Sequence, residues 1–168
     1  MITHRLVNLL NMMTKFNKKG FTLVEIMIVV AIIGLLAAIA IPNLLRARVN
    51  ANDQAVRGDL RTFSSAMESY RATLNPPAYP TVLTTLTDTT TSNPPYLDTT
   101  WTSAATRRGH SPMTFTSSAA GVNYAMTATS SASQSTVTYC VDQTGVIRAG
   151  TIAASSAGCD TGNPAISG

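Results

Sequence analysis

Apolar residues dominate the chain directly after position 20. An almost unbroken apolar run extends from Phe21 to Ile41, and its only charged residue is Glu25. At ~1.5 Å of rise per residue, a helix of this length measures about 30 Å, which is enough to cross the hydrocarbon core of a bilayer. We therefore expect a membrane-spanning helix over residues 21–42.

The pattern after Pro42 is that of an amphipathic helix. Pro42 removes a backbone donor and crowds the carbonyl of Ala38, so we expect a helix kink at this position rather than a helix end. The second half of the helix is predicted over residues 43–75, and Pro76-Pro77 stop it. Its apolar residues recur at steps of three, four and seven and form one stripe that packs on a sheet: Val49, Val56, Leu60, Phe63, Met67, Tyr70 and Leu74.

The remaining sequence predicts a connecting loop followed by a sheet. Residues 76–111 are rich in proline and threonine and contain one short helical pattern near Val82–Leu86. Four apolar side chains are expected to anchor this connection: Tyr79, Tyr96, Leu97 and Trp101. From residue 112 to 150 the apolar period becomes two, which predicts antiparallel strands at residues 113–116, 122–128, 136–142 and 146–149.

The predicted fold class is therefore α+β, with one long N-terminal helix packed on a small antiparallel sheet. A tight turn is expected at Asp142–Gly145 and a looser one at Ser130–Ser135. Alternate residues of two central strands should face the stripe of the helix: Val122, Tyr124, Met126, Val137, Tyr139 and Val141.

The positive charge of the chain is concentrated in its first twenty residues. The formal net charge is +4, but the first twenty residues hold four basic residues and no acid, so the rest of the chain is formally neutral. Positive residues mark the cytoplasmic flank of a membrane span, so we expect everything after Asn43 to lie outside the cytoplasm. Beyond the span, Arg46 and Arg48 are expected to be countered by Asp53 and Asp59. The chain shows no basic groove, which argues against nucleic acid as a primary partner.

The chain lacks a recognisable catalytic motif. Its two histidines are His4 and His110, its acids are scattered singly, and it has neither a glycine-rich phosphate loop nor metal-ligand spacing. We therefore expect no enzymatic activity, no cofactor and no bound metal. Arg107, Arg108 and His110 precede the strands and are expected to form a solvated turn.

The two cysteines, Cys140 and Cys159, both lie near the C-terminus. In a chain exported by an N-terminal segment, such a pair predicts a disulfide formed in an oxidising compartment. Two free thiols are the alternative, whereas a metal site needs more ligands than these cysteines and distant histidines supply. The bridge would tie the small, polar tail at residues 151–168 to the strand at 136–142.

The residues around position 20 resemble a known family. Lys18-Lys19-Gly20-Phe21-Thr22-Leu23-Val24-Glu25 and the aliphatic run behind it closely resemble the class III leader and N-terminal helix of type IV pilins and type II secretion pseudopilins. The resemblance extends over residues 18–48. It implies that residues 1–20 are a leader recognised through Lys18 and Lys19, and that a prepilin peptidase cuts between Gly20 and Phe21. The same peptidase would methylate the amine of Phe21. Met1, Met12 and Met13 remain alternative start sites.

The resemblance also supplies a partner for the acid inside the apolar run. Once Gly20 is removed, the free amine of Phe21 becomes a positive group near Glu25. The two groups can pair within one chain, four residues apart, or between chains. The resemblance implies the second, in which Glu25 pairs with the Phe21 amine of a neighbouring subunit and fixes the axial step of a filament. The alternative is that Glu25 is an acid at a helix N-terminus, tolerated through the helix dipole.

As implied by the resemblance, the chain would be a structural subunit of a helical, homo-oligomeric type IV pilus. Its further partners would be the prepilin peptidase, an inner-membrane assembly platform and the membrane before assembly. The precursor would lie in the inner membrane, and the filament would lie at the cell surface with the disulfide-bounded loop of residues 151–168 exposed.

Three alternatives remain open. A type II secretion pseudopilin would share the N-terminal segment, but major pseudopilins tend to replace the disulfide with an acidic calcium-binding loop, and the tail here has Asp160 alone. A membrane-anchored binding domain that never polymerises would keep the Gly20–Phe21 bond. A conventional secretory signal cut near Ala38–Ala40 is opposed by Glu25 and by the length of the apolar run.

Overall fold

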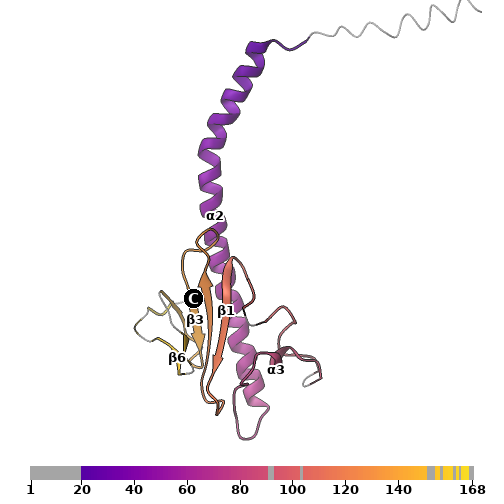
Figure 1. Cartoon of the computed structure of the whole chain (residues 1–168), viewed down its shortest axis with the longest axis vertical. Helices are drawn as coiled ribbons and strands as arrows, with labels where there is room; N and C mark the ends of the chain where they lie inside the picture. The colour runs from indigo at the N-terminus through magenta and orange to yellow at the C-terminus, as the bar shows by residue number, and fades with distance from the viewer. Residues whose placement is uncertain are drawn as a thin grey trace, which may run out of the picture. The chain divides into compact units, whose positions relative to one another are not determined.

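The structure is a computed structural model, and it describes residues 20–90, 93–102, 104–150, 154–155, 157–160, 162 and 164–166. The predicted leader, including Lys18 and Lys19, lies outside the described residues apart from Gly20. The chain divides into two compact units, Met1–Asn43 and Leu44–Gly168. One helix, α2 (Leu23–Ala72), continues from the first unit into the second (Figure 1).

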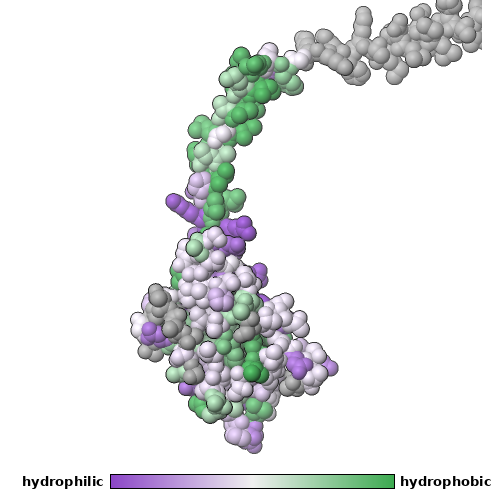
Figure 2. Space-filling view, viewed as in Figure 1, coloured by the Kyte–Doolittle hydropathy of each residue, from purple (hydrophilic) through white to green (hydrophobic). Residues whose placement is uncertain are grey.

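The first unit contains the apolar half of α2. Its large hydrophobic side chains are exposed along the whole segment, with Leu23 at 74% and Leu35 at 66% exposure. Figure 2 shows the resulting hydrophobic surface. Pro42 lies inside α2, and the side chain of Asn43 donates to the carbonyl of Ile39 over 3.1 Å. The helix therefore continues past Pro42, as predicted, and the kink at that residue remains a prediction.

In the second unit, α2 buries one stripe of side chains. Val56, Leu60, Phe63 and Met67 are fully buried, as their spacing of three and four residues predicts. Leu74 is 38% exposed, so its assignment to the stripe was wrong. The reason is that α2 ends at Ala72 and the chain turns directly afterwards, which removes Leu74 from the face of the helix.

Four antiparallel strands pack on this stripe: β1 (His110–Ser117), β2 (Tyr124–Ser130), β3 (Tyr139–Asp142) and β4 (Ile147–Ala149). Their order in the sheet is β1-β2-β3-β4, and the register places Met126 opposite Phe115 and Val141. The predicted α+β fold class, with a long helix on a small antiparallel sheet, is confirmed.

The strand limits differ from the predicted ones. β1 begins at His110 and β3 at Tyr139, and β2 begins two residues later than expected. Val122 is 64% exposed, so the expectation that it faces the helix was wrong. It belongs to the β1–β2 turn, where Gly121 has a φ of +63° and a Cβ at this glycine would meet the carbonyl oxygen of Tyr79 at 2.6 Å. A close backbone approach of this kind favours glycine.

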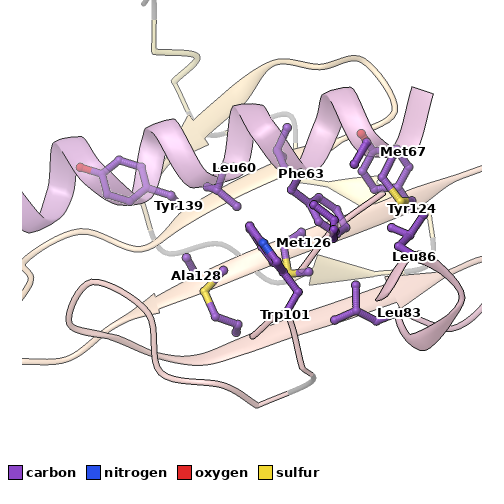
Figure 3. Packing of buried hydrophobic residues seen from close by; sticks show 14 of the residues in the cluster. Leu60, Phe63, Met67, Leu83, Leu86, Trp101, Tyr124, Met126, Ala128 and Tyr139 are labelled. Atoms are coloured by element: carbon purple, nitrogen blue, oxygen red, sulfur yellow. The ribbon is translucent and has the colours of Figure 1, made fainter. Parts of the chain in front are cut away.

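The core lies between α2 and one face of the sheet. Figure 3 shows Phe63 of α2 among Trp101, Tyr124 and Met126, and the ring centroids of Phe63 and Trp101 are 5.4 Å apart. The segment between α2 and β1 contributes Trp101 and the side chains around α3 (Thr84–Thr87). Of its predicted anchors, Tyr79, Leu97 and Trp101 are buried, and Tyr96 is partly buried against the core.

The opposite face of the sheet is also covered. Ala125 and Cys140 form a second buried cluster with Cys159, which belongs to the short hairpin of β5 (Ala154–Ser155) and β6 (Gly158–Cys159). The hairpin of the small, polar tail thus covers the centre of the sheet. β2 and β3 are consequently buried on both faces, which explains why nearly all of their residues are inaccessible.

Both outer edges of the four-stranded sheet have backbone partners. Along β1, the amide of Ala104 donates to Met113 over 2.8 Å, and the amide of Met113 donates to Ala105 over 3.0 Å. Along β4, the amide of Ile166 donates to the carbonyl of Ile147 over 2.8 Å. Segments without regular secondary structure thus occupy the two edges.

Candidate functional site

The N-terminal end of α2 is closed by a reciprocal pair of hydrogen bonds. The amide of Glu25 donates to the hydroxyl of Thr22 over 3.2 Å, and the amide of Thr22 donates to Oε2 of Glu25 over 3.4 Å. This is a capping box, which satisfies two amide donors that a helix start leaves without intrahelical partners. The motif Thr-x-x-Glu before an apolar run is its sequence signal, and the sequence interpretation missed it.

The capping box determines where the acid of the span is directed. Glu25 accepts a hydrogen bond from the amide of Thr22, and Thr22 directly follows Phe21 in the sequence. Among the described residues, Oε1 of this carboxylate has no hydrogen-bond partner. The arrangement therefore holds one carboxylate oxygen in the helix cap and leaves the second available to a positive group.

The helix behind this cap exposes a continuous apolar surface. The run from Leu23 to Leu45 contains no large hydrophobic side chain that is buried, and an exposed surface of this size normally marks a site of interaction with a membrane or with protein. By length and composition, α2 is the one helix among the described residues that could cross a membrane, a criterion that signal sequences near an N-terminus also meet.

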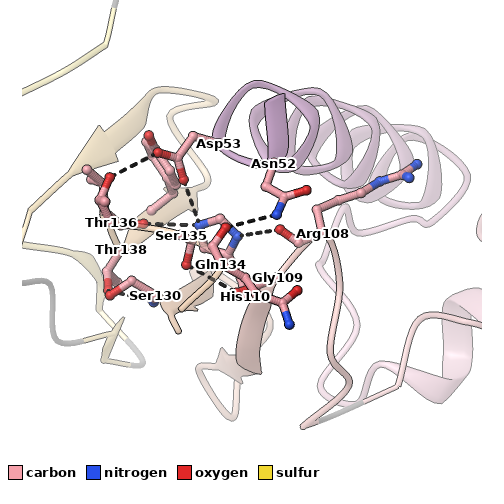
Figure 4. A network of polar contacts seen from close by, with 12 residues as sticks. Asn52, Asp53, Arg108, Gly109, His110, Ser130, Gln134, Ser135, Thr136 and Thr138 are labelled. Carbon is pink, nitrogen blue, oxygen red and sulfur yellow. Dashed lines mark hydrogen bonds and ion pairs between the residues drawn. The ribbon is translucent and has the colours of Figure 1, made fainter. Parts of the chain in front are cut away.

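A second polar arrangement joins α2 to the sheet (Figure 4). His110 is fully buried. Its Nδ1 lies 3.2 Å from the carbonyl oxygen of Arg108, its Nε2 lies 3.1 Å from that of Val137, and Nε2 is also 3.5 Å from Oδ1 of Asp53. Since carbonyl oxygens only accept hydrogen bonds, a ring nitrogen that carries a proton donates to one of these carbonyls. Asp53 lies beside the ring: its Oδ2 accepts from Thr136 over 3.2 Å, and its Oδ1 is buried without a hydrogen-bond partner.

Further hydrogen bonds fix the same region. The side chain of Asn52 donates to the carbonyl of Gln134 over 2.9 Å, and the hydroxyl of Ser135 donates to the carbonyl of Gly109 over 3.1 Å. Asn52 and Asp53 of α2 thus hold both the turn before β1 and the loop between β2 and β3. These residues act through structure, and no sequence motif predicts them because they come from three separate segments.

The expected solvated turn at residues 107–110 was wrong for two of its three side chains. His110 is buried, and Arg107 lies over the ring of Trp101 at 4.1 Å from its centroid. Arg107 also pairs with Asp59 over 3.4 Å, which Arg108 approaches at the same distance. The face of the Trp101 ring thus makes a cation–π contact with the guanidinium of Arg107.

This pairing changes the charge balance beyond the apolar run. Asp53 and Asp59 were expected to counter Arg46 and Arg48, but Asp53 contacts His110 and Asp59 contacts the two arginines before β1. Arg46 and Arg48 are exposed. The expected local neutralisation is therefore wrong, because tertiary contacts engage both acids.

On the face of the sheet away from α2, a disulfide joins Cys140 of β3 to Cys159 of β6. The amide of Cys159 also donates to Oδ2 of Asp142 over 3.1 Å, while Oδ1 of Asp142 accepts from the amide of Thr144 over 2.9 Å. The side chain of Asp142 thus connects the β3–β4 turn to the C-terminal hairpin. Within the described ranges, no cluster of three or more potential metal ligands is present.

The N-terminal segment matches a known family model. Residues 15–41 match the prokaryotic N-terminal methylation motif. The type IV wide pilus major component PilA4 of Thermus thermophilus is 53% identical over 55 residues, which cover 33% of this chain and 42% of that protein. The type IV major pilin protein PilA of Myxococcus xanthus is 44% identical over 59 residues, which cover 34% of this chain and 27% of that protein.

The chain is also similar to a secretion-system protein. The type II secretion system core protein G of Klebsiella michiganensis is 39% identical over 69 residues, which cover 41% of this chain and 47% of that protein. In each of these three alignments the chain spans less than half the length of the relative. No solved structure matches the chain. The expected resemblance to type IV pilins and to type II secretion pseudopilins is confirmed by these matches.

Proposed function

We propose that the chain is a structural subunit of a type IV pilus. The observation that carries the proposal is the coincidence of the methylation motif at residues 15–41 with a helix that begins at Leu23, directly behind the predicted cut. Apart from Glu25, the first half of this helix exposes almost only apolar side chains. Such a helix needs either lipid or other copies of itself around it. A filament subunit uses both in turn, first in the membrane and then in the core of the filament.

Processing and assembly are linked through the first residues of α2 in this proposal. A prepilin peptidase recognises Lys18 and Lys19, cuts after Gly20 and methylates Phe21. The new amine is the positive group that Glu25 binds, and we assign this contact to the amine of a neighbouring subunit. Oε1 of Glu25 supports the assignment, because the capping box engages only the other oxygen of the carboxylate.

The globular unit forms the outer part of the filament, and the chain acts as building material rather than as an enzyme. Before assembly the chain is held in the inner membrane, where an assembly platform receives it. After assembly the filament lies at the cell surface. The relatives support this proposal because two of them are named as pilus components.

A type II secretion pseudopilin is the second candidate function, and the similarity to core protein G favours it. The two functions differ in the product. A pilin forms long filaments that shearing releases from cells, whereas a pseudopilin acts in a short structure in the periplasm. The Cys140–Cys159 bridge at the place of a calcium-binding loop favours the pilin.

Intact-mass spectrometry of the chain purified from its membrane tests the processing step. We expect the mass of residues 21–168, oxidised at both cysteines, with one additional methyl group. A mass that retains residues 1–20 would refute the proposal. Sheared filaments that contain this chain as their main component favour the pilin, and secretion defects without such filaments favour the pseudopilin.

Variants at the cap separate the two roles of Glu25. Glu25→Gln keeps an acceptor oxygen for the capping box but removes the charge, and Thr22→Ala weakens the cap but keeps the charge. If the charge acts in assembly, Glu25→Gln reduces filament yield at least tenfold with normal processing, while Thr22→Ala retains more of it. Equal yields from Glu25→Gln and the unmodified chain would contradict the assigned pairing.

A further inference from the structure

Two arginines stand where the apolar part of α2 ends. Leu44 and Leu45 are 72% and 53% exposed, and Arg46 follows directly, with Arg48 two residues later. Both arginines are exposed, and the hydrophilic colour in Figure 2 begins along α2 where the hydrophobic colour stops. If the apolar half spans a bilayer, these guanidinium groups lie at the depth of the headgroups on the side opposite to Lys18 and Lys19.

The acids of the protein do not neutralise these arginines. Asp53 is engaged with His110 and Thr136, and Asp59 is engaged with Arg107 and Arg108. Glu68, the next acid of α2, pairs with Arg71 over 3.4 Å and accepts a hydrogen bond from Tyr79. Within the described part of the chain, Arg46 and Arg48 therefore keep two positive charges without a carboxylate partner.

The spacing of the two arginines indicates what kind of partner fits them. Two residues along an α-helix correspond to a rotation of about 200°, so the two side chains leave the helix on opposite sides. A protein partner that docks on one side reaches one of them. A lipid surface surrounds the helix and reaches both, and a guanidinium group binds phosphate oxygens in a bidentate manner.

We propose that Arg46 and Arg48 bind the phosphate groups of lipid headgroups on the non-cytoplasmic side of the membrane and so fix the depth of the span. The inference rests on the membrane-inserted stage of the proposed function. Long side chains of this type extend along the helix so that their charge stays in the headgroup layer.

Magnetic dipolar coupling between arginine Cζ and lipid phosphorus tests the contact directly. The full chain, labelled with ¹³C at arginine Cζ, is placed in vesicles of phosphatidylethanolamine and phosphatidylglycerol, and insertion is checked by flotation. We expect dephasing by ³¹P of two arginine signals that disappear in the Arg46→Gln/Arg48→Gln variant. The control is Arg61→Gln, because Arg61 is exposed on the same helix about 20 Å further along and its signal should not be dephased.

The outcomes separate this inference from the proposed function. An inserted chain whose Arg46 and Arg48 signals show no dephasing overturns the inference, whatever the filament assays show. Equal dephasing by inorganic phosphate in a phosphate-free detergent also overturns it, since the site would then bind free phosphate rather than lipid. Dephasing confined to vesicles supports it even if the mass and filament measurements exclude a pilin. Far-UV circular dichroism of both variants verifies that the fold is retained.

Discussion

The buried pair of Asp53 and His110 permits the sharpest test of the fold. In Asp53→Asn the side chain keeps its size and can still accept a hydrogen bond from Thr136, but the negative charge 3.5 Å from Nε2 of His110 is removed. A ring nitrogen that carries a proton donates to the carbonyl of Arg108 or of Val137. When the ring is protonated, the substitution therefore leaves a buried cation without a counter-ion.

The expected loss of stability follows from the geometry. Oδ1 of Asp53 and Nε2 of His110 lie 3.5 Å apart, and both residues are buried. Removal of one partner from a buried pair typically costs ~3–5 kcal/mol, and relaxation around the amide recovers part of this energy. We expect Asp53→Asn to lower the free energy of unfolding by about 3 kcal/mol.

Urea denaturation of the full chain in detergent micelles measures this loss. Trp101 is the single tryptophan and is buried in the core of the second unit, so its fluorescence reports unfolding of that unit. Asp98→Asn is the control for the removal of an acidic charge: Asp98 is exposed, and because its Oδ1 accepts from the amide of Thr100, we expect a loss of about 1 kcal/mol.

A double-mutant cycle with His110→Gln isolates the interaction between the two residues. If the charges interact as described, the loss in the double variant is at least 1.5 kcal/mol smaller than the sum of the two single losses. A loss from Asp53→Asn no larger than that of the Asp98→Asn control would refute the ion pair. Additive losses in the cycle would show that the two residues act independently.

Three further outcomes are expected. A Cβ at Gly58 meets no atom within 4 Å, so Gly58→Ala stabilises the isolated chain by ~0.5–1 kcal/mol in denaturation; a decrease would show that the helix is not regular there. Replacing Cys140 and Cys159, which are 19 residues apart, with serine lowers the free energy of unfolding by about 3 kcal/mol, and an unchanged midpoint would contradict a bridge in the purified protein. Burial and the hydrogen bond to Glu68 raise the pKa of Tyr79 to about 12, above its value of about 10 in the unfolded chain. The free energy of unfolding therefore falls as the pH rises from 10 to 12. Urea titrations at both pH values should show a smaller fall for Tyr79→Phe.

Periodic patterns in the sequence predicted the elements well where one face of an element is buried. The stripe from Val56 to Met67 was found because each of its members contacts the sheet, and the α+β class follows from that stripe and the alternation after residue 112. The prediction failed at Leu74 and Val122, where an element ends. Turn geometry decides such ends, and it depends on contacts such as the approach of Gly121 to Tyr79, which lie far apart in sequence.

The sequence likewise predicted some features of the candidate site and missed others. The motif from Lys18 to Glu25 is continuous in sequence, so its resemblance to prepilins was visible from the residues alone. The capping box could also have been found, because Thr22 and Glu25 have the required spacing. The pairing of Asp53 and Asp59 with residues near position 110 could not have been found in this way, because ion pairs between distant segments leave no local pattern in the sequence. That pairing in turn isolates Arg46 and Arg48.

The occupied edges of the sheet have a consequence for a protein that is crowded with copies of itself. An exposed strand edge offers unpaired amides and carbonyls to the next molecule, and identical chains at high density can then join irreversibly through their backbones. Here residues Ala104–Ala105 along β1 and Ile166 along β4 already take up backbone groups at those edges. At these positions the backbone groups are therefore not available to a second copy of the chain, which reduces the risk of irreversible joining through the sheet.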